Sequence, residues 1–132
     1  MNKLTKGFYI VLEGPESVGK TTQIELVASE LKKYGYLVQV FKEPDHRSHI
    51  TARAIRQITQ DPNYPINTRA EVLLYNAARS LSLELIANAQ EQGIICLVDR
   101  NYLSTIAVQY YGRGDLPDYN TINSIISFAI GE

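Results

Sequence analysis

Hydrophobic residues in this chain fall into short continuous runs, separated by longer stretches in which they recur at helical spacing. The runs at residues 8–12, 36–41 and 94–98 predict three strands. The first run is continuous in the way typical of strands that are covered on both faces of a parallel sheet. Strands that alternate with helices then predict an α/β fold with right-handed crossovers between parallel strands.

The stretches between these runs predict helices. The helix predicted at 68–93 carries its own signals, because Thr68 and Glu71 form a capping-box pattern and Gly93 supplies a stop. Its apolar stripe is predicted to consist of Leu74, Ala78, Leu81, Leu85 and Ala89. The other predicted helices run from near Lys20 to Gly35, over 51–59, from after Arg100 to about Tyr111, and over 121–130.

A glycine-rich segment follows the first predicted strand. Residues 14–21 read Gly-Pro-Glu-Ser-Val-Gly-Lys-Thr and fit the phosphate-loop pattern G-x-x-x-x-G-K-[ST] in full. The glycines allow successive backbone N–H groups to face a phosphate, and the following helix adds its positive N-terminal end. The alternative is an ordinary turn between a strand and a helix. The phosphate-loop reading predicts that ATP contacts Gly14, Pro15, Glu16, Ser17, Val18, Gly19, Lys20, Thr21 and Thr22.

In this reading Lys20 reaches the β- and γ-phosphates and the Thr21 hydroxyl ligates Mg²⁺. Asp99 and Arg100 end the third predicted strand, which is a costly position for charges that serve no ligand. Ligands of parallel sheets bind outside the carboxyl ends of the strands, so we expect these two residues to meet the glycine loop. The alternative is a structural ion pair between Asp99 and Arg100, or with Lys20.

Tyr75 and Arg79 are four residues apart and therefore share one face of the predicted helix. An aromatic ring and a guanidinium on one face could stack on a nucleobase and donate to its carbonyl oxygen. In the alternative interpretation, Tyr75 belongs to the core and Arg79 is a solvated charge.

Composition narrows the class of protein. A chain of 132 residues is long enough for one compact domain. Its net charge of -1 provides no bulk attraction to nucleic acid or membrane, and no stretch reaches the roughly 20 apolar residues of a membrane helix. The single cysteine, Cys96, lies in an apolar run and is expected to be buried and reduced. These features predict a cytoplasmic protein.

Four segments together resemble a known family. They are residues 12–23 around the glycine loop, Lys42-Glu43-Pro44, residues 73–79, and residues 99–109 with Gly112-Arg113-Gly114 after them. In this order they resemble the thymidylate kinases. The resemblance implies a P-loop nucleoside monophosphate kinase-like fold, with a parallel sheet in the strand order two-three-one-four-five. It also implies transfer of a phosphoryl group from ATP to dTMP with Mg²⁺, giving dTDP and ADP, by a homodimer.

The resemblance also assigns roles to residues. Catalytic roles fall to Lys20, Asp99 and Arg100, with Arg100 on the acceptor phosphate. Asp99 is assigned to the Mg²⁺ region, with Thr21, or to the attacking phosphate oxygen. The acceptor nucleotide is expected to be bound by Glu16 at its 3′-hydroxyl, Tyr75 stacked on thymine, Arg79 at O4, Arg100, and the pocket-lining Ser104, Thr105 and Gln109.

The chain departs from the family pattern at several positions. Residues 45–48 replace the usual Gly-Gly-Thr, which leaves Arg47 as a candidate phosphate contact. Val108 stands where an aromatic residue is common, and Ser17 leaves the loop without a second basic residue.

Family members are also longer. We therefore expect residues 1–132 to form the N-terminal two-thirds of one kinase domain, truncated after the third strand, without the lid and the last two strands. This expectation leaves the first strand at an edge of the sheet. A bare apolar edge predicts poor solubility, unless a partner chain or the 121–130 helix covers it.

Two other functions remain open at this point. A deoxynucleoside kinase also combines a phosphate loop with an acidic-arginine segment, and differs in taking an acceptor without a phosphate. A nucleotide-binding module without turnover would account for Ser17 and for the shortness of the chain.

Overall fold

Three parallel strands, β1 (Tyr9–Leu12), β3 (Ile95–Asp99) and β2 (Val38–Lys42), form one sheet in the order β1-β3-β2. The computed structural model describes residues 2–44 and 49–132. The remaining elements are α1 (Lys20–Lys33), α2 (Ile50–Gln60), α3 (Thr68–Glu91), α4 (Tyr102–Ser104), η1 (Thr105–Gly112) and α5 (Tyr119–Ile130). The predicted α/β fold and strand order are confirmed, with strand ends shifted by one or two residues.

The register brings the carboxyl ends of the strands together. Leu12 of β1 and Lys42 of β2 both lie opposite Asp99, the last residue of β3. Parallel strands bind ligands at this edge, so the segments that follow each strand converge on one place. The central strand β3 therefore positions whatever chemistry the protein carries.

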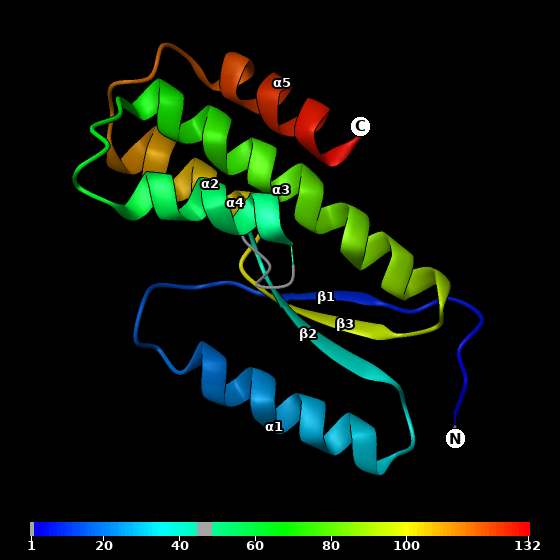
Figure 1. The fold of residues 1–132 in the computed structure, drawn as a ribbon. Helices are drawn as coiled ribbons and strands as arrows, with labels where there is room; N and C mark the ends of the chain where they lie inside the picture. The colour runs from blue at the N-terminus through cyan, green and yellow to red at the C-terminus, as the bar shows by residue number, and fades with distance from the viewer. Residues whose placement is uncertain (1, 45–48) are drawn as a thin grey trace.

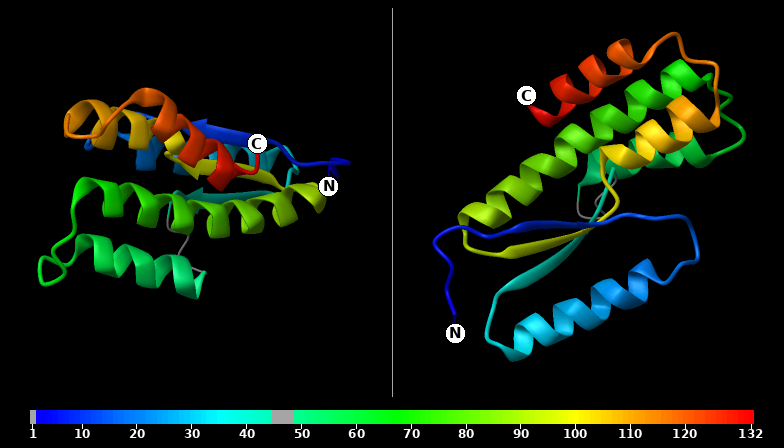
Figure 2. Two further views of the ribbon diagram at one scale, coloured as in Figure 1. Left: turned by 90° about the horizontal axis from the view of Figure 1, so that it is seen from above. Right: turned by 180° about the vertical axis from the view of Figure 1, so that it is seen from behind.

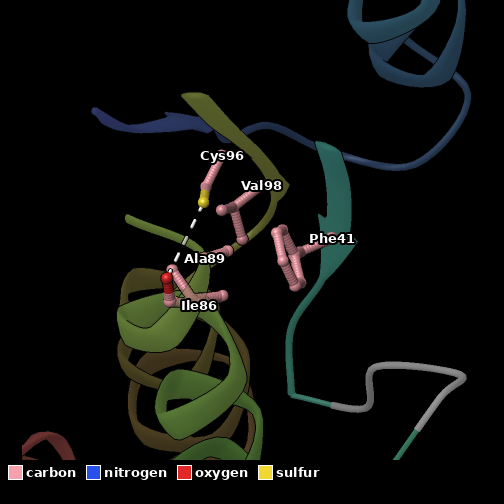
Figure 3. Close-up of a cluster of buried hydrophobic side chains, with 5 residues drawn as sticks. All are labelled: Phe41, Ile86, Ala89, Cys96 and Val98. Carbon is pink, nitrogen blue, oxygen red and sulfur yellow. Dashed lines mark hydrogen bonds between the residues drawn. The ribbon is translucent and has the colours of Figure 1, made fainter. Parts of the chain in front are cut away.

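Helices cover both faces of the sheet, with α1 on one side and α2, α3 and α5 on the other (Figures 1 and 2). Successive side chains of a strand point to opposite faces, and β3 follows this rule. Ile95 and Leu97 pack with Ile24 and Ala28 of α1. Cys96 and Val98 point to the other face, where they pack with Phe41, Ile86 and Ala89 (Figure 3).

The single cysteine belongs to this second cluster. Cys96 is fully buried, and its Sγ lies 3.8 Å from the carbonyl oxygen of Ile86. Burial raises the pKa of the thiol to about 11, because the interior disfavours the thiolate. The group is therefore uncharged and unreactive at neutral pH, which confirms its prediction as a small buried hydrophobe.

The first strand is less covered than its sequence predicts. Tyr9 and Ile10 are 37% and 39% exposed, and within residues 2–44 and 49–132 the strand β1 has a hydrogen-bonded neighbour on one side only. The expected cover on both faces of β1 is thus only partial: Val11 packs against the cluster of Cys96 and Val98, and Leu12 packs against the cluster beneath α1. The predicted edge position of β1 is confirmed. The C-terminal helix, named above as a possible cover for this edge, does not cover it, because α5 packs against α3 and η1.

The long helix α3 buries polar residues that the predicted apolar stripe does not contain. Asn76, Arg79 and Ser82 are exposed by 3% or less, whereas Leu74 and Leu81 are only partly buried. Ala78 and Ala89 of the predicted stripe are buried as expected, but elsewhere the observed buried face includes these polar residues in place of the predicted leucines. Three polar side chains inside the protein need partners, and these partners lie in the candidate site.

The start of α3 also differs from the prediction. Asn67, one residue before the helix, caps it by accepting the Ala70 N–H at 2.9 Å. Thr68 is already helical and its hydroxyl donates to Asp115, while Glu71 contacts Arg113. The predicted Thr68–Glu71 capping box is wrong, because both side chains bind the segment that follows η1 instead.

The helical stretch after Asp99 is mostly a π-helix. The Arg113 N–H donates to the carbonyl oxygen of Val108, five residues earlier, at 3.0 Å. Such wider turns are rare and are frequently found at functional sites. Here the wider turn buries Thr105 and Gln109, which both lie toward the ends of the strands.

The observed cap generates a prediction for stability. Asn67→Ala removes the acceptor for the Ala70 N–H, and we expect the free energy of unfolding to fall by about 1 kcal/mol. Asn67→Asp keeps an acceptor oxygen and should change it little. Urea denaturation measures both variants. Equal stability of Asn67→Ala and Asn67→Asp would contradict the assigned cap.

Candidate nucleotide-binding site

A cleft of about 760 Å³ lies at the carboxyl ends of the three strands. Segments that are distant in sequence form its walls: the glycine loop, the end of β2, α2, α3, and the segment from Asp99 through η1. Its lining residues are Pro15, Glu16, Ser17, Gly19, Lys20, Thr21, Lys42, Glu43, Pro44, Arg56, Gln60, Tyr75, Arg79, Asp99, Arg100, Asn101, Ser104, Thr105, Val108 and Gln109.

The glycine loop has the backbone geometry of an anion site. Gly14 and Gly19 have φ angles of 153° and 91°, in the region that glycine tolerates, and Ser17 adopts a φ of 58°. Gly19 is the N-cap of α1 and offers no side-chain cap, and the first turn contains no acidic residue. The first N–H groups of α1 therefore remain available to a phosphate, which the helix dipole also favours.

Lys20 lies over this loop. Its Nζ donates to the carbonyl oxygens of Gly14 and Pro15, at 3.0 and 2.6 Å. No carboxylate of the described residues pairs with it, so the alternative of an ion pair between Lys20 and Asp99 is wrong. The ammonium is held by neutral acceptors and can donate to an anionic ligand.

Asp99 carries an unsatisfied oxygen. Its Oδ1 is buried and has no hydrogen-bond partner among the described residues. Buried polar atoms almost always have a partner, so an orphan of this kind indicates an absent ligand. Asp99 lines the same cleft as the exposed hydroxyl-bearing Thr21. A carboxylate and a hydroxyl fit the oxygen-only preference of Mg²⁺, with water and phosphate oxygens as the remaining ligands.

Arg100 is held in an unusual conformation. Its φ is 70°, in the left-handed region, which costs of the order of 1–3 kcal/mol for a residue other than glycine. Its Nη1 donates to Ser104 Oγ at 3.0 Å and lies 3.8 Å from Glu13 Oε1. The alternative of a pair with Asp99 is therefore wrong, and the guanidinium faces the cleft.

Arg79 is buried, with 1% of its surface exposed, so the alternative of a solvated charge is wrong. Its Nε donates to Glu43 Oε2 at 2.9 Å, its Nη1 to Asn76 Oδ1 at 2.7 Å, and its Nη2 to Thr105 Oγ1 at 2.9 Å. These bonds use three of the five N–H groups of the guanidinium. The other two belong to the Nη atoms of a side chain that lines the cleft.

Glu43, the partner of Arg79, receives a second hydrogen bond. The Tyr9 hydroxyl donates to its Oε1 at 3.2 Å. Burial raises the pKa of Glu43, although the Arg79 guanidinium opposes this effect. Burial and the neighbouring carboxylate also raise the pKa of Tyr9, which keeps the phenol protonated as a donor. Both oxygens of Glu43, a lining residue of the cleft, are thus occupied.

Tyr75 lies partly exposed in the cleft, four residues before Arg79. The carbon at the centre of the Arg56 guanidinium is 5.8 Å from the ring centroid, and Arg56 Nη1 approaches the Tyr75 hydroxyl at 3.5 Å. A ring beside a cation, with part of its surface open, provides a stacking platform for a flat ligand. The alternative of a purely core role for Tyr75 does not agree with this position.

Most of the site residues expected from the sequence line the cleft together. Gly14, Val18 and Thr22 are not among the lining residues. Several other residues line the cleft although the sequence did not identify them as site residues: Lys42, Glu43, Arg56, Gln60 and Asn101. The signal for Lys42 and Glu43 was their position at the end of β2, the same signal that identified Asp99. Arg47 and its neighbours at 45–48 lie outside the described residues.

The fold and this cleft define an α/β protein of the P-loop nucleoside monophosphate kinase-like class. A sequence model of the family described as thymidylate kinase matches residues 12–125. The chain is 42% identical over 120 residues to a thymidylate kinase of Halothermothrix orenii, and 43% identical over 121 residues to one of Syntrophotalea carbinolica. The chain therefore belongs to the thymidylate kinase family.

These matches cover a larger share of this chain than of the relatives. The Halothermothrix match covers 89% of this chain and 57% of the relative, and the Syntrophotalea match covers 89% and 55%. A thymidylate kinase of Deinococcus radiodurans is 38% identical over 84% of this chain and 53% of its own length. The chain thus spans little more than half the length of these relatives. In the part that the structure describes, no helix has the length and apolarity needed to span a membrane.

The buried ion pair at the cleft wall generates a second prediction. Glu43→Gln leaves the Arg79 cation buried without its anion, and the free energy of unfolding should fall by about 3–5 kcal/mol. The double variant Glu43→Gln/Arg79→Met removes both charges and should recover a large part of this loss. Glu30→Gln breaks an exposed pair with Lys33 and should cost no more than about 1 kcal/mol.

Urea denaturation measures all three variants. A loss for Glu43→Gln as small as that for Glu30→Gln would show that the pair between Glu43 and Arg79 is not desolvated.

Proposed function

We propose that this protein transfers the γ-phosphoryl group of ATP to dTMP in the presence of Mg²⁺, giving dTDP and ADP. One observation carries the proposal: a single cleft has the phosphate loop on one side and Tyr75, Arg79 and Arg100 on the other. Donor and acceptor sites must share a cleft for direct transfer, because the reacting oxygen and phosphorus have to meet in line.

The donor side is formed by the loop and the start of α1. Backbone N–H groups of residues 16–22 bind the β- and γ-phosphates of ATP, and Lys20 adds its positive charge. Mg²⁺, held through Thr21 and Asp99, neutralises charge on the same phosphates when it is bound. The free Oδ1 of Asp99 and its place beside the loop support this assignment.

The acceptor side is formed by α3, Arg100 and η1. The Tyr75 ring stacks on thymine, and the remaining Nη protons of Arg79 donate to the O4 carbonyl. Arg100 binds the acceptor phosphate, and Glu16 in the loop accepts from the 3′-hydroxyl. The positions of Ser104, Thr105 and Gln109 along the cleft support a role in lining the nucleoside pocket.

Catalysis in this arrangement is positioning and charge neutralisation, since phosphoryl transfer needs little covalent work from the protein. Ser17 contributes no charge inside the loop. Lys42 and Arg56 are further cations of the described cleft, and their presence favours an acceptor that carries its own phosphate. This observation favours dTMP over thymidine, the acceptor of a deoxynucleoside kinase.

A homodimer and a cytoplasmic location stay predictions. The homodimer rests on the family resemblance alone. The location rests on the single buried and reduced cysteine, Cys96.

The proposed reaction is tested by following ATP consumption, and the donor site is tested by measuring ATP binding. With dTMP present ATP should be consumed, and with thymidine it should not. Lys20→Ala should weaken ATP binding by about 2–4 kcal/mol, because it removes a charge-assisted contact, whereas Lys33→Ala at the exposed end of α1 should not. Calorimetry measures binding. ATP affinity that is unchanged in Lys20→Ala would exclude the phosphate-loop assignment.

The acceptor site is tested by comparing dTMP with dCMP. A buried donor left without an acceptor is costly, so Arg79 should reject cytosine, which carries an amino group in place of O4. We expect dTMP to bind at least about tenfold more tightly, a difference of about 1.4 kcal/mol. Equal affinities in a side-by-side titration would remove the base-reading role of Arg79 and leave the phosphate loop unaffected.

A further inference from the structure

We propose that Glu13 is a positioning residue, which holds the Arg100 guanidinium through the Ser104 hydroxyl in the orientation that receives the acceptor phosphate. The proposal rests on the function proposed above, and it concerns a residue to which neither the phosphate-loop pattern nor the family resemblance assigns a role. Glu13 stands between the last residue of β1 and the first glycine of the loop.

The carboxylate of Glu13 accepts several hydrogen bonds from the segment that carries Arg100. Its Oε2 accepts the backbone N–H groups of Asn101 and Ser104, at 3.1 and 3.0 Å. The Ser104 hydroxyl lies 2.9 and 3.0 Å from its two oxygens. The Glu13 carboxylate thereby binds two residues, Asn101 and Ser104, that lie 88 and 91 positions away from it in the sequence.

The Ser104 hydroxyl links this anion to Arg100. A carboxylate accepts only, so the hydroxyl must donate its single proton to Glu13. Its lone pairs are then left to accept the Arg100 Nη1 donor, at 3.0 Å. The order Arg100 to Ser104 to Glu13 is therefore fixed by the chemistry of the three groups. Without the anion the hydroxyl could rotate and release the guanidinium.

The backbone of Arg100 is fixed independently. Its N–H donates to the Leu12 carbonyl oxygen at 3.0 Å, and its φ is 70°. The side chain consequently leaves the end of β3 in a direction set by this strained backbone conformation. Among the described residues, Ser104 and the more distant Glu13 are the only polar partners of the guanidinium. Together with the backbone conformation, these two partners orient the remaining donors of the guanidinium.

Glu13 itself is not placed to bind the nucleotide. It is absent from the cleft lining, its side chain is 24% exposed, and both of its oxygens are occupied. One of these oxygens also accepts the Gly14 N–H, at 3.3 Å. The same anion thus contacts the first residue of the donor loop and the support of the acceptor arginine, so it sets the relative position of the two phosphate sites.

The first test compares the affinities of dTMP and thymidine, which differ only in the phosphate. Glu13→Gln and Ser104→Ala should each lower the ratio of dTMP to thymidine affinity by about tenfold, as expected when one charge-assisted contact is misaligned. Thymidine affinity should not change in Glu13→Gln, because Glu13 does not line the cleft. Glu25→Gln removes the same charge from an exposed position on α1 and should leave both affinities unchanged. Equal losses for dTMP and thymidine in Glu13→Gln would indicate a merely structural role and overturn the proposal.

A second measurement does not depend on the identity of the ligand. In protein labelled with ¹⁵N, the Arg100 side-chain resonance reports how restricted the guanidinium is. We expect restricted motion in the native protein and in Glu25→Gln, and faster averaging in Glu13→Gln and Ser104→Ala. Equal restriction in all four proteins would overturn the proposal. Loss of restriction without any binding of dTMP would uphold the positioning role and refute the proposed function instead.

Discussion

The buried ion pair between Glu43 and Arg79 joins three of the segments that form the walls of the cleft. Glu43 follows β2, Arg79 lies on α3, and Thr105 of η1 accepts from the same guanidinium. Two charges that are almost completely buried are favourable only with good geometry and further hydrogen bonds, which Tyr9 and Asn76 provide. A pair of this kind contributes little net stability by itself. Its physical consequence is that β2, α3 and η1 can be assembled in one way, because any other arrangement leaves a buried charge unpaired.

Unlike the paired charges of Glu43 and Arg79, the phosphate-binding groups are left without a cap or a charged partner. The N-terminal end of α1 has no side-chain cap, Lys20 has only carbonyl partners, and the Asp99 Oδ1 has no partner in the described part of the chain. Each of these groups would gain from an anion or a cation that arrives with a ligand. The cleft therefore combines a polar wall held together by the hydrogen bonds of Glu43 and Arg79 with a set of groups that are left unsatisfied for a ligand.

The sequence predicted the features that depend on local pattern. The three strands, the loop geometry around Gly14 and Gly19, and the meeting of Asp99 with the loop follow from short runs, glycine spacing and the rules of parallel sheets. The misplaced features depend on distant partners. Thr68 and Glu71 look like a capping box until Asp115 and Arg113 take their side chains. The polar face of α3 cannot be recognised as buried without knowing that Glu43 and Thr105 lie opposite it.

The role proposed for Glu13 likewise could not be predicted from the local sequence. In sequence it is one acidic residue before a glycine, and nothing local distinguishes it from a solvated charge. Only the parallel pairing of β1 with β3 brings the residue after Leu12 beside the residues after Asp99. Both strands end at the same level, so the first residue beyond each must face the other. A carboxylate at that point meets backbone donors and a hydroxyl, and an apolar residue there would leave them unsatisfied. The register of two strands thus determines which side chain can orient Arg100.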